Sequence, residues 1–189
     1  MTQRDQLLEL LRERSLTTGD FVLASGARST YYVDCRRTTM HALGQVLVGQ
    51  LGWALLRDSG LEPDSIGGLT MGADPISYAI SHTSALAGDP LNAFSVRKQA
   101  KEHGRGKRIE GCFEAGHRVV IVEDVITSGG SALDACAAVE AEGGRILGVL
   151  AVLDREGGGR ERIEAAGYQV FSLFGINELL RADEAAVSR

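Results

Sequence analysis

Two adjacent acids precede a loop of small residues in the middle of the chain. An aliphatic run at 119–122 leads into Glu123 and Asp124, and residues 127–131 read Thr-Ser-Gly-Gly-Ser before a helical pattern. Glycines let the backbone approach a ligand closely, and free N–H groups at a helix start favour a phosphate. Carboxylates beside a phosphate make sense if they face sugar hydroxyls or a metal ion that also contacts the substrate. The alternative is that the acids are solvated strand-end residues and that the loop only caps a helix.

A second segment with the chemistry to bind a polyanion is residues 97–108, RKQAKEHGRGKR. It holds six Lys or Arg, one Glu and His103 in a chain whose net charge is -5. The segment has no helical apolar stripe and directly follows a predicted buried strand. We therefore predict a cationic flap that closes over a polyanion and neutralises charge developing on a leaving group. A solvated charged loop is the alternative for this composition.

The elements that would position these two segments follow from the hydrophobic pattern. Beyond Pro63, short apolar runs alternate with helical patterns, which is typical of a mostly parallel sheet buried on both faces. The expected strands are 66–69, 91–96, 119–122, 146–153 and 170–173, and the expected helices are 76–86, 131–142 and 160–166. Ligands of such sheets bind beyond the carboxyl ends of the strands. We therefore expect an α/β fold, a parallel sheet flanked by helices, with its site at that edge.

The first 60 residues have a different pattern and predict an N-terminal helix and a small hood over the carboxyl edge of the sheet. Leu7, Leu8 and Leu11 recur at helical spacing, and residues 21–34 alternate around a Ser-Gly break as in a hairpin. Residues 39–57 follow a helical period in which Trp53 is expected to pack. The prediction is one domain, 1–189, with the helix and hood at 1–60 and the core α/β sheet at 61–175.

Composition limits the classes of protein that the chain can be. With 44% hydrophobic and 24% charged residues in 189, it is too apolar for a disordered chain. The net charge of -5 argues against a general nucleic-acid or membrane-surface binder. Cys35, Cys112 and Cys136 have no CxxC spacing and suggest neither a disulfide framework nor a zinc cluster. No segment approaches a membrane span, and a cytoplasmic location without nucleic-acid or membrane partners is expected.

Three segments resemble a known family. VVIVEDVITSGGS, residues 119–131, resembles the phosphoribosyl diphosphate (PRPP) signature of the type I phosphoribosyltransferases. RKQAKEHG, from residue 97, is similar to the flexible catalytic loop of the orotate phosphoribosyltransferases, and FVLASGARSTYYVD, residues 21–34, is similar to the segment that lines their orotate side. The resemblance covers residues 21–155, and it implies a type I phosphoribosyltransferase-like fold.

The resemblance also implies an activity. The reaction would move the 5-phosphoribosyl group from PRPP to orotate, giving orotidine 5-monophosphate and diphosphate in de novo pyrimidine (UMP) biosynthesis. The implied cofactor is Mg²⁺, held mainly by PRPP and water and not directly by protein side chains. The implied partners are orotate, PRPP and a second copy of the chain, in a homodimer with shared active sites.

Individual positions take their implied roles from the matching motifs. Lys101, His103 and Asp124 would be catalytic. The implied PRPP-binding residues are Arg97, Lys98, Lys101, His103, Glu123, Asp124, Val125, Ile126, Thr127, Ser128, Gly129, Gly130 and Ser131. The implied orotate-binding residues are Tyr31, Tyr32, Thr127 and Arg155. A planar Arg fork suits a ring that carries carbonyls and a carboxylate.

The chain departs from many family members at two places. Ala24 stands where they carry a Lys before the Ser-Gly, and residues 70–74 read TMGAD where they include a Lys. Arg28, the cationic flap or backbone N–H groups around Gly72 are the candidates for compensating the lost charge. Two other functions stay open: a purine phosphoribosyltransferase, and a non-catalytic PRPP-binding regulator, which would usually need an added DNA-binding element.

Overall fold

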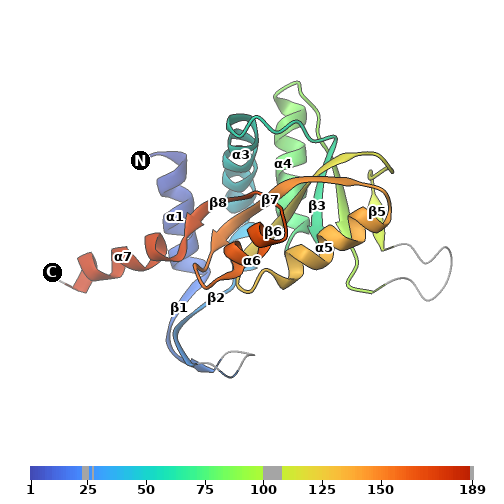
Figure 1. The fold of residues 1–189 in the computed structure, drawn as a ribbon. Helices are drawn as coiled ribbons and strands as arrows, with labels where there is room; N and C mark the ends of the chain where they lie inside the picture. Colours follow the sequence, from blue (N-terminus) through green and yellow to red (C-terminus); the bar gives the residue numbers. More distant parts are fainter. Residues whose placement is uncertain (23–25, 27, 100–107, 188–189) are drawn as a thin grey trace.

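A six-stranded sheet forms the centre of the fold in the computed structural model (Figure 1). The model describes residues 1–22, 26, 28–99 and 108–187, the last six as backbone only. The strand order is β5-β4-β3-β6-β7-β8, and every neighbouring pair is parallel except β4 with β5. The strands are β3 (Ser65–Leu69), β4 (Asn92–Val96), β5 (Ile109–Gly111), β6 (Arg118–Ile126), β7 (Arg145–Asp154) and β8 (Val170–Gly175).

Helices cover both faces of this sheet because its central strands are apolar on both sides. Val120 and Val122 join the buried cluster that also contains residues of α1, α3 and α4, whereas Val119 and Ile121 join the cluster under α5 and α6. Figure 1 shows α3 and α4 beside one another and α5 on the other side of the strands. The helices are α1 (Gln3–Arg14), α2 (Arg36–Thr39), α3 (Ala42–Asp58), α4 (Asp74–Leu86), α5 (Gly130–Ala141), α6 (Gly159–Ala165) and α7 (Ile176–Val187).

The N-terminal region forms a helix and a separate hairpin. Helix α1 begins at a capping box in which the Asp5 N–H donates to Thr2 Oγ1 (3.1 Å) and the Thr2 N–H donates to Asp5 Oδ2 (2.8 Å). Strands β1 (Leu16–Val22) and β2 (Arg28–Val33) pair antiparallel in a sheet of their own. Figure 1 shows this hairpin extending away from the main sheet. Its base, at the end of β2, is the part that returns to the carboxyl edge.

The predicted α/β class, the order of its elements and the hairpin are confirmed, and four details differ. Strand β6 continues to Ile126, so Glu123 and Asp124 lie within a strand that is still paired with β7 and not in a loop after it. Strand β5 adds an antiparallel edge, and three residues are too few to give a pattern. The expected helix over 39–57 is divided into α2 and α3 around Met40 and His41, and α7 was not expected.

The sequence contains no segment that resembles a membrane span, and none of the helices in the described ranges is long and apolar enough to cross a membrane. The division of one domain into a helix and hood at 1–60 and a core sheet at 61–175 stays a prediction.

Candidate active site

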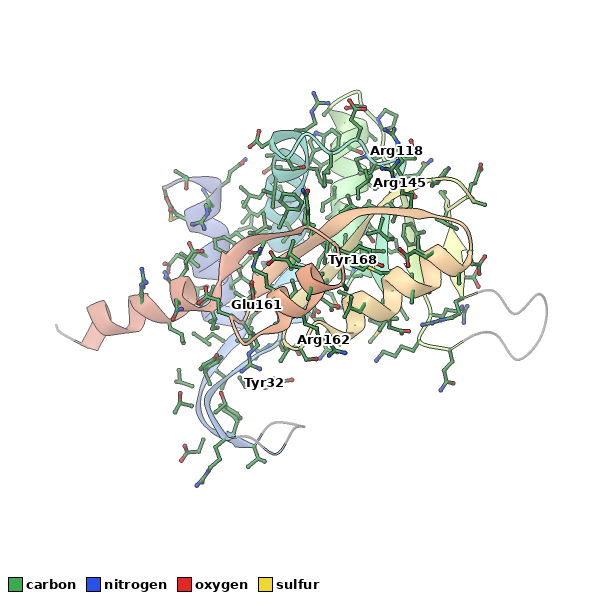
Figure 2. The ribbon with its side chains drawn as sticks, in the orientation of Figure 1. Tyr32, Arg118, Arg145, Glu161, Arg162 and Tyr168 are labelled. Carbon is green, nitrogen blue, oxygen red and sulfur yellow. The ribbon has the colours of Figure 1, made fainter. Side chains whose placement is uncertain are left out.

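A cavity of about 690 Å³ opens at the carboxyl edge of the main sheet. The segment after the hairpin, the β3–α4 loop, the end of β4, the end of β6 and the residue after β7 all contribute to it. In Figure 2, Tyr32 lies at the base of the hairpin, while Arg118 and Arg145, which begin β6 and β7, lie at the opposite end of the strands. The lining residues are Tyr32, Val33, Asp34, Arg36, Leu69, Thr70, Met71, Gly72, Arg97, Lys98, Gln99, Glu123, Asp124, Val125, Thr127, Ser131 and Arg155.

The two acids of β6 both line this cavity and differ in their electrostatics. Burial, followed by the charge of the neighbouring Asp124, raises the pKa of Glu123 to about 8. Asp124 lies against the backbone of the β3–α4 loop, where a Cβ on Gly72 would come within 2.6 Å of Asp124 Oδ1. One oxygen of Asp124 also accepts the Val125 N–H at 3.0 Å. At neutral pH the pair therefore carries fewer than two negative charges in the free protein.

A second, smaller cavity of about 80 Å³ lies at the turn between β6 and α5. It is lined by Glu123, Val125, Ile126, Thr127, Ser128, Gly129, Gly130 and Ser131. Gly129 has a φ of +74°, and a Cβ there would lie 2.8 Å from the Gly159 carbonyl oxygen, so this turn requires glycine. Because α5 begins at Gly130, its unpaired N–H groups and its dipole favour a phosphate group here. The side chain of Ile126 is buried in the core and contributes to the turn through its backbone.

The hairpin and the residue after β7 form a further wall of the cavity, lined by Tyr32 and Arg155. The Arg155 guanidinium carbon lies 5.1 Å from the centre of the Tyr31 ring, and the Arg155 N–H donates to the Ile126 carbonyl at 3.0 Å. Tyr31 packs against the core, whereas Tyr32 is 45% exposed and lines the cavity. Tyr32 therefore forms the open surface of this wall, and Tyr31 supports Arg155 from behind.

A buried ion pair fixes the turn that carries Arg155. Asp154, only 3% exposed, accepts the Arg160 Nε–H (2.7 Å) and the Glu156 N–H (2.8 Å). Arg160 also donates to the Val170 carbonyl and to Ser172 Oγ of β8. Arg155 therefore leaves a backbone that is held on both sides.

Cations line the cavity at the end of β4. Arg97 and Lys98 are both lining residues, and Arg97 is paired with Glu110 of β5 at 3.1 Å. Arg108 donates two hydrogen bonds to Asp134 of α5 (3.1 and 2.8 Å), which ties the far side of the basic segment to the start of that helix. Lys101, His103 and Ala24 lie outside the described residues.

The structure thus brings together the described residues of the predicted site except Tyr31, which contacts Arg155 but lines neither cavity. Glu123, Asp124, Arg97, Lys98, Tyr32 and Arg155 share the larger cavity, and the turn at 125–131 forms the smaller one. Sequence reasoning gave no role to Asp34 and Arg36, which also line the larger cavity. Their signal was an acid and a base two residues apart, with one residue between the Tyr-Tyr pair and the acid.

Comparison with known proteins gives the family. No protein-family model matches the chain. It is 45% identical over 183 residues to the orotate phosphoribosyltransferase of Aquifex aeolicus, covering 95% of this chain and 99% of that protein. The chain belongs to the orotate phosphoribosyltransferase family. Orotate phosphoribosyltransferases are enzymes of the glycosyltransferase type, so this finding favours an enzyme over a non-catalytic regulator and an orotate enzyme over a purine enzyme.

Solved orotate phosphoribosyltransferases have the same fold. The Mycobacterium tuberculosis enzyme in complex with Fe(III) dicitrate superposes with a TM-score of 0.84 at 44% identity, covering 95% of this chain and 99% of that one. A structure of the same enzyme in complex with PRPP gives a TM-score of 0.80 at 41% identity, covering 94% and 99%. The expected type I phosphoribosyltransferase-like fold is therefore confirmed.

Proposed function

We propose that this chain transfers the 5-phosphoribosyl group of PRPP to orotate, forming orotidine 5-monophosphate and diphosphate in de novo pyrimidine biosynthesis. One observation carries the proposal beyond family membership. A single cavity joins the acids of β6 to the wall of Tyr32 and Arg155, and the phosphate-sized cavity at 127–131 adjoins it through Glu123, Thr127 and Ser131. These are the surfaces that a phosphorylated sugar and a flat anionic ring require, placed side by side.

The reaction is a displacement at the anomeric carbon of the sugar. A ring nitrogen of orotate loses its proton and forms the new bond to that carbon while the bond to the diphosphate oxygen breaks. The diphosphate leaves with the electron pair, and the proton passes to the diphosphate or to water. The sugar becomes electron-poor on the way, so the protein need not supply a covalent nucleophile. Positioning of both substrates and stabilisation of charge account for catalysis.

The phosphate and the ribose would be held by β6 and the turn after it. The N–H groups at the start of α5 and the hydroxyls of Thr127, Ser128 and Ser131 donate to the 5-phosphate. Glu123 and Asp124 accept hydrogen bonds from the ribose hydroxyls, which fixes the sugar relative to the base. Ionisation of Glu123 then accompanies binding, because hydroxyl donors favour the charged carboxylate.

Orotate would lie between Tyr32 and Arg155. The guanidinium of Arg155 donates to ring oxygens in its own plane, and the Tyr31 contact at 5.1 Å sets its direction. Arg97 and Lys98 are placed to bind the diphosphate, together with Lys101 and His103 from the cationic flap. Neutralising the leaving group in this way lowers the barrier to its departure.

A magnesium ion fits this site only together with the substrate. Within the described residues, no group of three or more His, Cys, Asp or Glu could hold a metal ion. Two carboxylates, Glu123 and Asp124, do line the cavity, and Mg²⁺ commonly takes one or two carboxylates plus phosphate oxygens and water. When bound, the ion would supply charge neutralisation on the diphosphate. The residues that would hold it, through the ribose and water, are those two acids.

We also propose a homodimer with shared sites. Large apolar side chains remain exposed on two neighbouring parts of the surface, at α2–α3 and beside the β3–α4 loop, and a second copy of the chain would cover them. They are Met40 (52% exposed), Leu43 (48%), Val46 (52%), Met71 (59%) and Tyr78 (50%). Because Met71 also lines the larger cavity, a partner on this face would lie next to the diphosphate.

A reducing cytoplasm is the proposed location. The three cysteines are free, and Cys35 and Cys136 are buried in the two core clusters. No disulfide therefore contributes to the fold, as is usual for reducing compartments.

The experiment that tests the proposed function is a competition between bases. The full chain is incubated with PRPP, Mg²⁺ and equal concentrations of orotate, adenine and hypoxanthine, and the nucleotides formed are identified by mass spectrometry. We expect orotidine 5-monophosphate alone. A purine nucleotide as the main product would support the purine alternative, and no nucleotide at all would support the non-catalytic regulator.

A further inference from the structure

The segment after the hairpin brings an additional cation into the larger cavity. Arg36 begins helix α2 and is among the residues that line the cavity. Asp34 holds it in a fixed direction: Arg36 Nε–H donates to Asp34 Oδ1 (2.8 Å), Nη2–H donates to Oδ2 (3.1 Å), and the Arg36 N–H donates to Oδ1 (3.2 Å). The Arg36 side chain is therefore preorganised before any substrate binds.

The fork of Arg36 keeps donors for a further anion. Asp34 takes Nε and Nη2, and within the described part of the chain Nη1 donates to no protein atom. The side chain stays 44% exposed, against 24% for Asp34, so the free end of the guanidinium is accessible. A guanidinium has five N–H donors, so one with two of them fixed by a carboxylate can add an oxygen of a phosphate without losing its first partner.

Arg36 lines the same cavity as the acids and the cations to which the ribose and the leaving group are assigned. The charge of Asp124, after the hydrogen bonds and charge of Asp34, helps to raise the pKa of Arg36, which places the two side chains within electrostatic reach. Asp124 in turn contacts the backbone at Gly72. The β3–α4 loop contributes no cation here, because it reads Thr-Met-Gly-Ala-Asp. The other arginine of the cavity that follows a strand of the main sheet on the β7 side, Arg155, contacts Tyr31 and is assigned to orotate.

We propose that Arg36, oriented by Asp34, binds the diphosphate of PRPP and supplies positive charge that the β3–α4 loop lacks in this chain. The inference rests on the proposed function, since it assigns a residue to the leaving group of that reaction. Arg36 acts by charge and hydrogen bonding on the diphosphate oxygens, both when PRPP binds and when the diphosphate departs.

The neighbouring residue provides a matched control. Arg37 is an exposed arginine in the same short helix and is not among the residues that line the cavity. Arg36→Gln and Arg37→Gln therefore remove the same charge from adjacent positions, and only the first removes it from the cavity. Arg36→Lys keeps the charge but loses the planar fork.

The test measures binding of inorganic diphosphate by calorimetry, with Mg²⁺ in excess, and the KM of each substrate. We expect Arg36→Gln to weaken diphosphate binding about 10-fold or more and to raise the KM for PRPP, with the KM for orotate unchanged. Arg36→Lys should recover part of the affinity, and Arg37→Gln should match the parent. Circular dichroism checks that each variant is folded, and the Lys variant serves as the test if the Gln variant is not.

Three results would overturn the inference. The first is unchanged diphosphate binding in Arg36→Gln, and the second is an equal loss of diphosphate affinity in Arg37→Gln. The third is a rise in KM confined to orotate, which would show that Arg36 binds the base and not the diphosphate. Failure of the proposed function is separable, because diphosphate binding does not depend on which base is used. A chain that ignores orotate yet loses diphosphate binding in Arg36→Gln would refute the function and keep the inference.

Discussion

The guanidinium carbon of Arg155 lies 5.1 Å from the centre of the Tyr31 ring, and this contact joins the residue after β7 to the N-terminal hairpin. The contact links the hairpin, which is a sheet of its own, to the turn that follows β7 of the main sheet. The direction of Arg155 therefore depends on the hairpin as well as on its own turn.

Arg155→Lys should damage orotate binding selectively. Lysine keeps the charge but cannot donate two parallel hydrogen bonds or stack on Tyr31, so we expect the KM for orotate to rise about tenfold or more with little change in the KM for PRPP. Steady-state kinetics measures both. Arg145→Lys, an exposed change at the other end of β7, is the control. Equal effects on the two substrates would contradict the orotate assignment.

Gly72→Ala should weaken PRPP binding through Asp124. The added Cβ would lie 2.6 Å from Asp124 Oδ1, closer than real contacts allow, so the carboxylate or the loop must move. We expect at least a tenfold loss of PRPP affinity by calorimetry, about 1.4 kcal/mol. Gly157→Ala is the control, since nothing lies nearer than 4.0 Å to its Cβ. Normal PRPP affinity in Gly72→Ala would mean that the position of Asp124 is not critical.

PRPP binding should release a proton from Glu123. The pKa of this carboxyl is about 8 in the free protein, so it is mostly protonated at pH 7. Ribose hydroxyls or a metal ion would favour the ionised form, which predicts tighter binding as the pH rises from 7 to 9. Calorimetry in buffers of different ionisation enthalpy counts the protons. Glu123→Gln should remove both the proton release and the pH dependence of binding. Unchanged proton release in that variant would show that the proton comes from another group.

The same carboxyl should make the free protein less stable in base. Its folded pKa lies above the ordinary value of 4.5, so between those values the folded state binds a proton that the unfolded state does not. The stability that Glu123 contributes is then complete below pH 4.5 and is lost as the pH rises through 8. Denaturant titrations at pH 6 and pH 9 should show a smaller decline for Glu123→Gln than for the parent. Parallel declines would contradict the raised pKa.

Asp154→Ala should be strongly destabilising. It would remove the closest carboxylate from Arg160 and leave only the longer ion pair with Glu164 at 3.6 Å. Because Asp154 is 3% exposed, we expect a loss of about 3 kcal/mol in the free energy of unfolding. The comparison is Asp89→Ala, which breaks the exposed pair with Arg57 and should cost less than about 1 kcal/mol. Denaturant titration measures both. Similar small losses would show that the Asp154 pair does not fix the Arg155 turn.

Shared active sites predict complementation between inactive chains. Lys101→Ala and Asp124→Ala chains, unfolded and refolded together in equal amounts, give mixed dimers in about half of the population. If Lys101 serves the partner's site, one of the two sites in each mixed dimer has both residues, and roughly a quarter of parental activity per chain returns. Mixed dimers that are present but inactive would restrict Lys101 to its own subunit.

The hydrophobic pattern was enough to predict the five parallel strands of the sheet and the helices between them, but not β5 or α7. The Glu-Asp and Thr-Ser-Gly-Gly-Ser strings predict a phosphate site, and they do line adjoining cavities. The pattern could not tell that β6 continues past Glu123, because that extension depends on pairing with β7, as in Val125 with Leu153. Arg36 escaped notice because its position in the cavity follows from how the hairpin returns to the sheet, which is a long-range relation with no local periodicity.

The raised pKa of Glu123 likewise depends on tertiary burial and could not be predicted from the sequence. The sequence shows only that the two acids are adjacent in one strand. Their different electrostatics arise because Glu123 is desolvated by the surrounding fold.

The most direct test of the whole account is the stoichiometry of one reaction. Orotate loss is followed by its absorbance while released diphosphate is measured in the same sample, with PRPP and Mg²⁺ each supplied or withheld, for the parent and Asp124→Asn. The account predicts one diphosphate per orotate consumed, dependence on both additions, and a large fall in rate for the variant. Diphosphate release without orotate consumption, or full activity in Asp124→Asn, would contradict it.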